Sequence, residues 1–201
     1  MQKTFGIIGA GNIAKAVAGH LVKAGYQVTL SSRKDPALLA DTIASLGAGA
    51  LAGTPAEAAR ADVVLLALPW SQLASLPELT NWDQRLVIDA TNHFISGPPT
   101  FQVADLDGRA SSEVVRDYVP GARLVKAFNT LYFKVLEANP QETDGKRVLF
   151  LSGDHADANA EVAEVITSLG FSVINLGTLA SGSKLQQAKG PLSTVNLIKK
   201  G

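Results

Sequence analysis

Residues suited to binding a dinucleotide phosphate stand near the start of the chain. The segment Gly9-Ala-Gly11-Asn12-Ile13-Ala14 directly follows a short apolar run and precedes residues with helical spacing. Gly9 permits a tight turn, Gly11 lets the backbone approach a pyrophosphate, and Ala14 allows the helix to pack closely. The anion would meet free N–H groups and the positive end of the helix dipole. We therefore predict that Gly9, Gly11, Asn12 and Ile13 bind the cofactor.

Hydroxyl and basic residues occupy the position at which an acidic residue would select NAD. In NAD-binding folds, an Asp or Glu about twenty residues after the glycines accepts hydrogen bonds from the ribose 2′-hydroxyl. This chain has Ser32, Arg33 and Lys34 there. Because these groups attract a 2′-phosphate, we predict binding of NADP(H). Two alternatives stay open: a solvated basic loop, and a shifted register that gives Asp35 the ribose role.

Three later apolar runs end in residues that would border the nicotinamide end of the cofactor. They are Leu68, Pro69 and Trp70 after the first run, Asn92 and His93 after the second, and Asn129 and Thr130 after the third. We expect Leu68, Pro69, Trp70 and Asn92 to contact the cofactor. We expect His93, Asn129 and Thr130 to contact a substrate.

The chain lacks the residue patterns of metal or nucleophilic catalysis. It has no cysteine, and its three histidines show no metal-ligand spacing, so we predict no metal. We interpret His20 as structural and His155 as solvated. Hydride transfer between two rings depends on alignment rather than on an acid or base, so we nominate no catalytic residue. Four aromatic side chains could stack on a ligand or simply pack: Trp70, Phe94, Tyr132 and Phe133.

Short β-branched runs alternate with helical spacing along the chain, which predicts buried strands in a doubly wound α/β sheet. We expect a Rossmann-type, mainly parallel sheet with helices on both faces and a short C-terminal α/β extension. The expected strands are Thr4–Ile8, Gln27–Ser31, Gly49–Leu51, Val63–Ala67, Arg85–Asp89, Arg123–Ala127, Arg147–Ser152 and Ser172–Asn175. The expected helices are Asn12–Ala24, Pro36–Leu46, Pro55–Ala61, Ser112–Tyr118, Leu131–Ala138 and Ala156–Leu169, and within the irregular tail Leu192–Ile198 could be helical. Flanking carboxylates such as Asp89 would serve turns or caps.

The length and composition indicate one globular domain. At 201 residues, we expect a single domain, with a dinucleotide-binding core over about 1–146 and an extension over about 147–201. Eighteen basic residues balance eighteen acidic ones, which argues against nucleic acid or an anionic membrane as a partner. The N-terminus lacks a signal-peptide pattern, so we expect a cytoplasmic protein.

The chain resembles the coenzyme F-420-dependent NADP oxidoreductases and the related reductase domains of membrane metalloreductases. The matching residues are Gly9-Ala-Gly-Asn-Ile13, Ser32-Arg33, Leu68-Pro69-Trp70, Lys126-Ala-Phe-Asn-Thr130 and Ser152-Gly153-Asp154. The resemblance implies hydride transfer between NADPH and a flat redox ring, such as a deazaflavin or a flavin. It also implies that Ser32 and Arg33 hold the 2′-phosphate, and that Leu68, Pro69 and Trp70 border the cofactor.

Other functions remain compatible with this pattern. The chain could be a non-catalytic NADP(H)-binding or redox-sensing module, because sites rather than folds carry function. β-Hydroxyacid dehydrogenases and pyrroline-5-carboxylate reductases share the glycine segment, but they usually add a long helical domain. Here the residues after Arg147 indicate strand, helix and strand. We also expect a homodimer.

Overall fold

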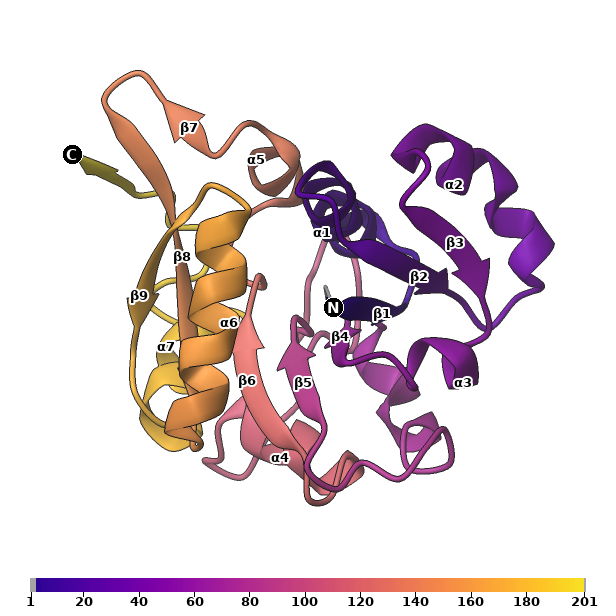
Figure 1. The fold of residues 1–201 in the computed structure, drawn as a ribbon. Helices are drawn as coiled ribbons and strands as arrows, with labels where there is room; N and C mark the ends of the chain where they lie inside the picture. Colours follow the sequence, from indigo (N-terminus) through magenta and orange to yellow (C-terminus); the bar gives the residue numbers. More distant parts are fainter. Residues whose placement is uncertain (1–2, 201) are drawn as a thin grey trace.

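A central sheet carries helices on both faces in the computed structural model, which describes residues 3–200 (Figure 1). The strands are β1 (Thr4–Ile8), β2 (Gln27–Ser31), β3 (Ala50–Gly53), β4 (Val63–Leu66), β5 (Leu86–Asp89), β6 (Arg123–Ala127), β7 (Gln141–Glu142), β8 (Gly145–Gly153), β9 (Ser172–Asn175) and β10 (Ile198–Lys200). The α-helices are α1 (Asn12–Lys23), α2 (Ala40–Leu46), α3 (Pro55–Ala58), α4 (Ser111–Tyr118), α5 (Phe133–Glu137), α6 (Ala156–Ser168) and α7 (Lys184–Gln186). Shorter helical turns cover Pro36–Leu39, Trp70–Ser75 and Leu179–Ser183.

The strand order confirms the predicted Rossmann-type sheet. The order is β10-β8-β6-β5-β4-β1-β2-β3, and the strands from β3 to β6 pair in parallel. The carboxyl ends of these strands therefore share one edge. Since the chain leaves β1 toward β2 on one side and β4 lies on the other, the order reverses beside β1. Ligands of such sheets bind at this switch point.

Strand β4 shows how the sheet is held between its two helical layers. Val63 and Leu65 belong to one apolar cluster, whereas Val64 and Leu66 belong to the other. All four side chains are buried, because successive residues of a strand point to opposite faces. The strand accordingly has no polar face, as expected for a parallel sheet covered on both sides.

The C-terminal part departs from the expected pattern in two ways. β8 runs antiparallel to β6, although β9 then pairs in parallel with β8. The predicted helix Leu192–Ile198 is wrong: Thr194 has a positive φ of 65°, and β10 pairs antiparallel with the start of β8. The main-chain N–H of Val148 also donates to the carbonyl of Leu197. Strand pairing along the open edge of β8 therefore replaces the helix that local spacing favoured.

A glycine in β1 supplies a test of this packing. A Cβ added to Gly6 would lie 1.8 Å from the main-chain oxygen of Ala58 in α3. We expect Gly6→Ala to lower the free energy of unfolding by about 1 to 3 kcal/mol, because backbone atoms must move. Gly19→Ala in α1 is the matched control, since its nearest contact is Leu46 at 3.8 Å. Urea denaturation measures the free energy of unfolding of both variants. Equal values for Gly6→Ala and Gly19→Ala would contradict the close packing of Gly6 against α3.

A buried histidine between α1 and α5 gives a prediction about pH. His20 donates from Nε2 to the carbonyl of Leu136 at 2.7 Å, and its ring meets Phe171 edge-on. This structure confirms the structural role predicted for His20. Burial lowers the pKa of His20 below its ordinary value of 6.5, partly offset by the Leu136 contact. The unfolded chain therefore takes up a proton at a higher pH than the folded protein.

We expect the protein to lose stability as the pH falls below about 6.5, and His20→Gln to reduce this loss. The measurement is the urea midpoint at about pH 7.5 and about pH 5.5 for each variant. The exposed His155 provides the control, because His155→Gln should keep the full pH dependence. If the urea midpoint of His20→Gln fell between the two pH values by as much as that of the unmodified protein, other groups would cause the loss of stability.

Candidate functional site

A single cleft of about 1160 Å³ extends along the carboxyl edge of the sheet. It brings together residues that lie far apart in the sequence, from the ends of β1, β2, β4, β5 and β6. The predicted site residues that line it are Gly9, Gly11, Asn12, Ile13, Ser32, Arg33, Lys34, Leu68, Pro69, Trp70, Asn92 and Asn129. Cofactor contact by these residues stays a prediction, but the fold gathers them on one surface.

The glycine loop has the geometry that an approaching phosphate requires. Gly9 adopts a φ of 121°, and a Cβ there would lie 2.2 Å from the carbonyl oxygen of Ala67. Only glycine fits this turn. A Cβ on Gly11 would meet nothing within 4 Å, so the backbone is open toward the cleft. Helix α1 begins directly afterwards, its first turn contains no acidic residue, and no side chain caps it. Its N-terminal amides can therefore bind an anion.

The basic end of the cleft lies beyond β2. Ser32 is half-buried, and its Oγ accepts from the N–H of Lys34 at 3.2 Å, which folds the segment into a tight turn. Arg33 and Lys34 are exposed, and neither forms an ion pair with another residue in the range 3–200. Two cationic side chains are thus available at this end of the cleft.

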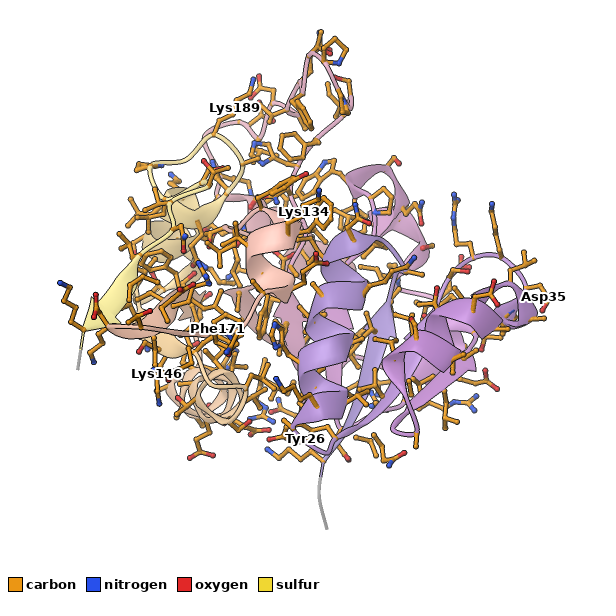
Figure 2. All side chains as sticks on the ribbon, turned by 90° about the horizontal axis from the view of Figure 1, so that it is seen from above. Tyr26, Asp35, Lys134, Lys146, Phe171 and Lys189 are labelled. Carbon is orange, nitrogen blue, oxygen red and sulfur yellow. The ribbon has the colours of Figure 1, made fainter. Side chains whose placement is uncertain are left out.

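Asp35 does not share this surface. Its Oδ1 accepts from the N–H of Ala37 at 2.9 Å and caps the helical turn Pro36–Leu39. The residue lies at the edge of the molecule and does not line the cleft (Figure 2). Because its carboxylate is engaged in capping, the alternative in which Asp35 meets the ribose is disfavoured.

Aromatic side chains form the wall at the other end of the cleft. The lining includes Trp70, Phe94, Tyr132 and Phe133, which the sequence singled out, and Phe101, which it did not. The rings of Phe94 and Phe101 meet edge-on at 5.5 Å, and the exposed fractions of Phe101 and Tyr132 are 44% and 55%. Such exposed rings offer stacking surface for a flat ligand.

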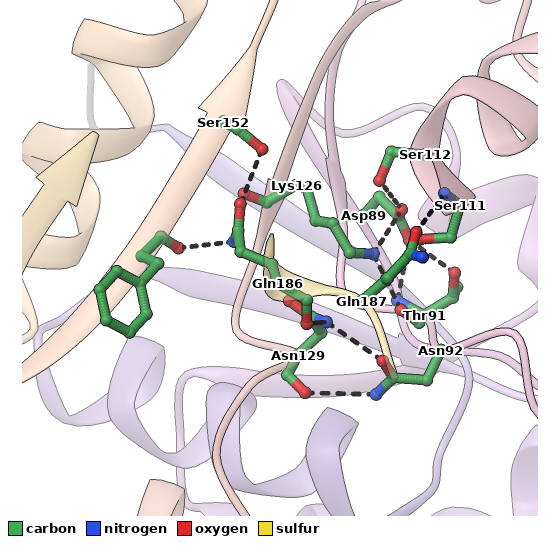
Figure 3. A network of polar contacts seen from close by, with 11 residues as sticks. Asp89, Thr91, Asn92, Ser111, Ser112, Lys126, Asn129, Ser152, Gln186 and Gln187 are labelled. Carbon is green, nitrogen blue, oxygen red and sulfur yellow. Dashed lines mark hydrogen bonds and ion pairs between the residues drawn. The ribbon is translucent and has the colours of Figure 1, made fainter. Parts of the chain in front are cut away.

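A polar network joins the ends of β5 and β6 to the C-terminal segment (Figure 3). The Nδ2 of Asn129 donates to Asn92 Oδ1 at 3.1 Å and to the carbonyl of Gln186 at 2.8 Å. In return, Asn92 Nδ2 donates to the carbonyl of Asn129 at 3.2 Å. The Gln186 side chain donates to the carbonyls of Lys126 and Phe150 and accepts from Ser152 Oγ. These contacts fix both asparagines against the cleft.

A buried ion pair underlies this network. Lys126 Nζ donates to Asp89 Oδ2 at 3.0 Å and to the carbonyl of Thr91 at 3.0 Å, and both charged side chains are fully buried. Asp89 also accepts from Ser112 Oγ and, through Oδ1, from the N–H and hydroxyl of Thr91. Asp89 therefore stabilises a turn, as predicted, but it also balances a buried lysine.

Two residues predicted to contact the substrate lie behind the cleft wall. His93 is buried, meets the ring of Trp70 edge-on at 5.9 Å, and faces a second cavity of about 320 Å³. Burial, together with Lys126 and Lys189, lowers the pKa of His93. Thr130 is buried as well, and its carbonyl accepts from the N–H of Thr194 at 2.7 Å. Both residues support the wall rather than line it.

The sequence analysis did not identify three residues of the site, namely Lys126, Phe101 and Gln186. A lysine inside the apolar run Leu-Val-Lys-Ala-Phe is a signal of a buried charge and could have been noticed. Gln186 carried no such signal, because it reaches the site from 57 residues beyond Asn129.

Across residues 3–200, the structure contains no group of three or more potential metal ligands. Over the same range, no helix has both the length and the apolar character needed to cross a membrane.

Residues 4–93 match the family model described as NADP oxidoreductase, coenzyme F420-dependent. The chain is 29% identical over 185 residues to Metalloreductase STEAP3 of Rattus norvegicus, a match that covers 90% of this chain and 35% of that protein. The chain thus spans about a third of the length of the curated relatives it matches.

Two solved structures share the fold over most of their length. A hypothetical protein of Sinorhizobium meliloti, SMa0349, is 43% identical with a TM-score of 0.92, over 99% of this chain and 97% of that one. A protein of Arthrobacter sp. FB24, provisionally assigned as an F420-dependent NADP reductase, is 24% identical with a TM-score of 0.74, over 88% and 86%.

The buried ion pair generates a stability prediction. Lys126→Met would leave the Asp89 carboxylate buried without its cation, so we expect a loss of about 3 to 5 kcal/mol in the free energy of unfolding. Arg109→Met is the control, because Arg109 pairs with Asp117 at the surface and should cost less than about 1 kcal/mol. Urea denaturation compares the two. Similar losses would show that Lys126 contributes no more than a surface cation.

Proposed function

We propose that the chain, whose residues 4–93 match the model of the coenzyme F420-dependent NADP oxidoreductases, is an NADPH-dependent oxidoreductase acting on a flat redox acceptor. The observation that carries the proposal is the continuity of the cleft. One surface joins the cationic Ser32-Arg33-Lys34 end, the open glycine loop and the aromatic wall. Its volume of about 1160 Å³ exceeds that of most single-ligand pockets, which leaves room for a dinucleotide and a second ring.

The residues present fit each part of NADP(H). The exposed Arg33 and Lys34 suit a 2′-phosphate, and the amides at the start of α1 suit the pyrophosphate. Leu68, Pro69 and Trp70 would border the nicotinamide end, with Asn92 beside them. When bound there, NADPH would supply a hydride to the acceptor, which would take a proton from solvent as NADPH is oxidised to NADP⁺.

The protein's own contribution to such a reaction is alignment. Asn92 and Asn129 are held by mutual hydrogen bonds, and the aromatic wall of the same cleft offers a stacking surface. Two rings that the cleft held close together and aligned would need no general acid or base for hydride transfer. A deazaflavin and a flavin both carry a flat ring that could stack on such a wall, and we propose one of these as the acceptor. Assembly as a homodimer stays a prediction.

A turnover assay separates this function from that of a non-catalytic NADP(H)-binding module. Purified protein is mixed with NADPH, and absorbance of the reduced nicotinamide is followed with a deazaflavin, FMN, a quinone or a ferric chelate. Oxidation of NADPH with a deazaflavin or FMN supports the oxidoreductase. Tight binding of NADPH without turnover of any acceptor would favour the binding module.

Arg33 should decide which dinucleotide binds. We expect Arg33→Ala to weaken NADPH binding by about 1.5 to 3 kcal/mol, or roughly tenfold to 150-fold, with little change for NADH. The reason is the loss of a charge-assisted contact to the 2′-phosphate. Isothermal titration calorimetry measures both affinities. Arg60→Ala serves as the matched control, because Arg60 is exposed and does not line the cleft. Equal losses for NADPH and NADH would argue against Arg33 as the selective residue.

A further inference from the structure

Asn129 carries a hydrogen-bond acceptor that the protein leaves unused. The residue lines the cleft, is only 6% exposed, and its side-chain oxygen Oδ1 is buried without a partner among residues 3–200. A buried acceptor that makes no hydrogen bond costs free energy, so native proteins seldom keep one without a reason. A ligand that brings an N–H group to this point would remove the cost.

The orientation of the amide is fixed by neighbours whose hydrogen-bonding roles are not ambiguous. The Gln186 main-chain carbonyl can only accept, so the group facing it at 2.8 Å must be Asn129 Nδ2. Likewise, the Asn129 main-chain carbonyl requires Nδ2 of Asn92, which turns Asn92 Oδ1 toward Asn129. Both hydrogens of Asn129 Nδ2 are therefore used. The amide cannot rotate to exchange its oxygen for its nitrogen without losing these contacts.

The place of Asn129 in the sheet indicates which part of a ligand it meets. Arg33 follows β2, the glycine loop follows β1, and Asn129 follows β6, with β4 and β5 between β1 and β6. A dinucleotide with its 2′-phosphate at Arg33 and its pyrophosphate at the glycine loop must therefore extend toward β5 and β6. Its far end is the nicotinamide, whose carboxamide carries two N–H donors.

We infer that Asn129 Oδ1 accepts a hydrogen bond from the carboxamide N–H of the nicotinamide and so fixes the rotation of that ring in the cleft. The inference rests on the proposed binding of NADP(H). The sequence analysis expected Asn129 to contact the substrate. The inference instead makes Asn129 a positioning residue of the cofactor site. The Gln186 carbonyl holds Asn129 in place, so the C-terminal segment would contribute to the orientation of the nicotinamide ring.

The test compares ligands that differ only at the proposed contact. The 3-acetylpyridine analogue of NADP⁺ replaces the carboxamide NH₂ by a methyl group and so lacks the donor. We expect the unmodified protein to bind NADP⁺ about three- to tenfold more tightly than the analogue. In Asn129→Ala this ratio should fall close to one, while the affinity for adenosine 2′,5′-bisphosphate, which lacks the nicotinamide, should not change. Calorimetry or fluorescence titration gives all the affinities.

Asn139→Ala is the matched control, because Asn139 is exposed outside the cleft and the ratio should survive there. Equal binding of the two dinucleotides by the unmodified protein overturns the inference, even if Asn129→Ala does not fold. A ratio that persists in Asn129→Ala overturns it as well. Failure of the unmodified protein to bind adenosine 2′,5′-bisphosphate and NADP⁺ would instead reject the proposed function.

Discussion

The buried pair of Lys126 and Asp89 is the constraint on which the site depends. The two residues lie side by side at the carboxyl ends of β5 and β6, where their register is set by the sheet. An ammonium group this deeply buried needs an anion, and its second bond to the Thr91 carbonyl ties down the turn that leads to Asn92. The pair thus links the stability of the sheet edge to the shape of the cleft.

The cleft combines rigid and open surfaces. At one end, the glycine loop and the exposed Arg33 offer free donors and charge to an anion. At the other end, the side-chain amides of Asn92 and Asn129 are held by hydrogen bonds to each other and to the Gln186 carbonyl, and Asn129 Oδ1 has no partner among residues 3–200. Such pre-organisation suits a reaction in which placing two rings matters more than proton transfer.

The sequence predicted the parts of the fold and site that depend on local patterns. Gly9, Gly11 and the strand ends were found because small residues and apolar runs have characteristic spacings. The antiparallel entry of β8, the strand at Ile198–Lys200 and the role of Gln186 could not be found in this way. They depend on pairing between segments far apart in the chain, and no local pattern records that pairing.

The contact between Asn129 and Gln186, which lies after β8, has a consequence for the order in which parts of the site form during synthesis. A ribosome makes the glycine loop and Arg33 early, and the strands β1 to β6 are complete by Ala127. Gln186, which holds Asn129 in its position, emerges about sixty residues later. During synthesis, the glycine loop and the residues after β2 can form while Asn129 still lacks its contact to the Gln186 carbonyl. The two ends of the cleft are thus completed at different times, and the end that carries Arg33 comes before the end that carries Asn129.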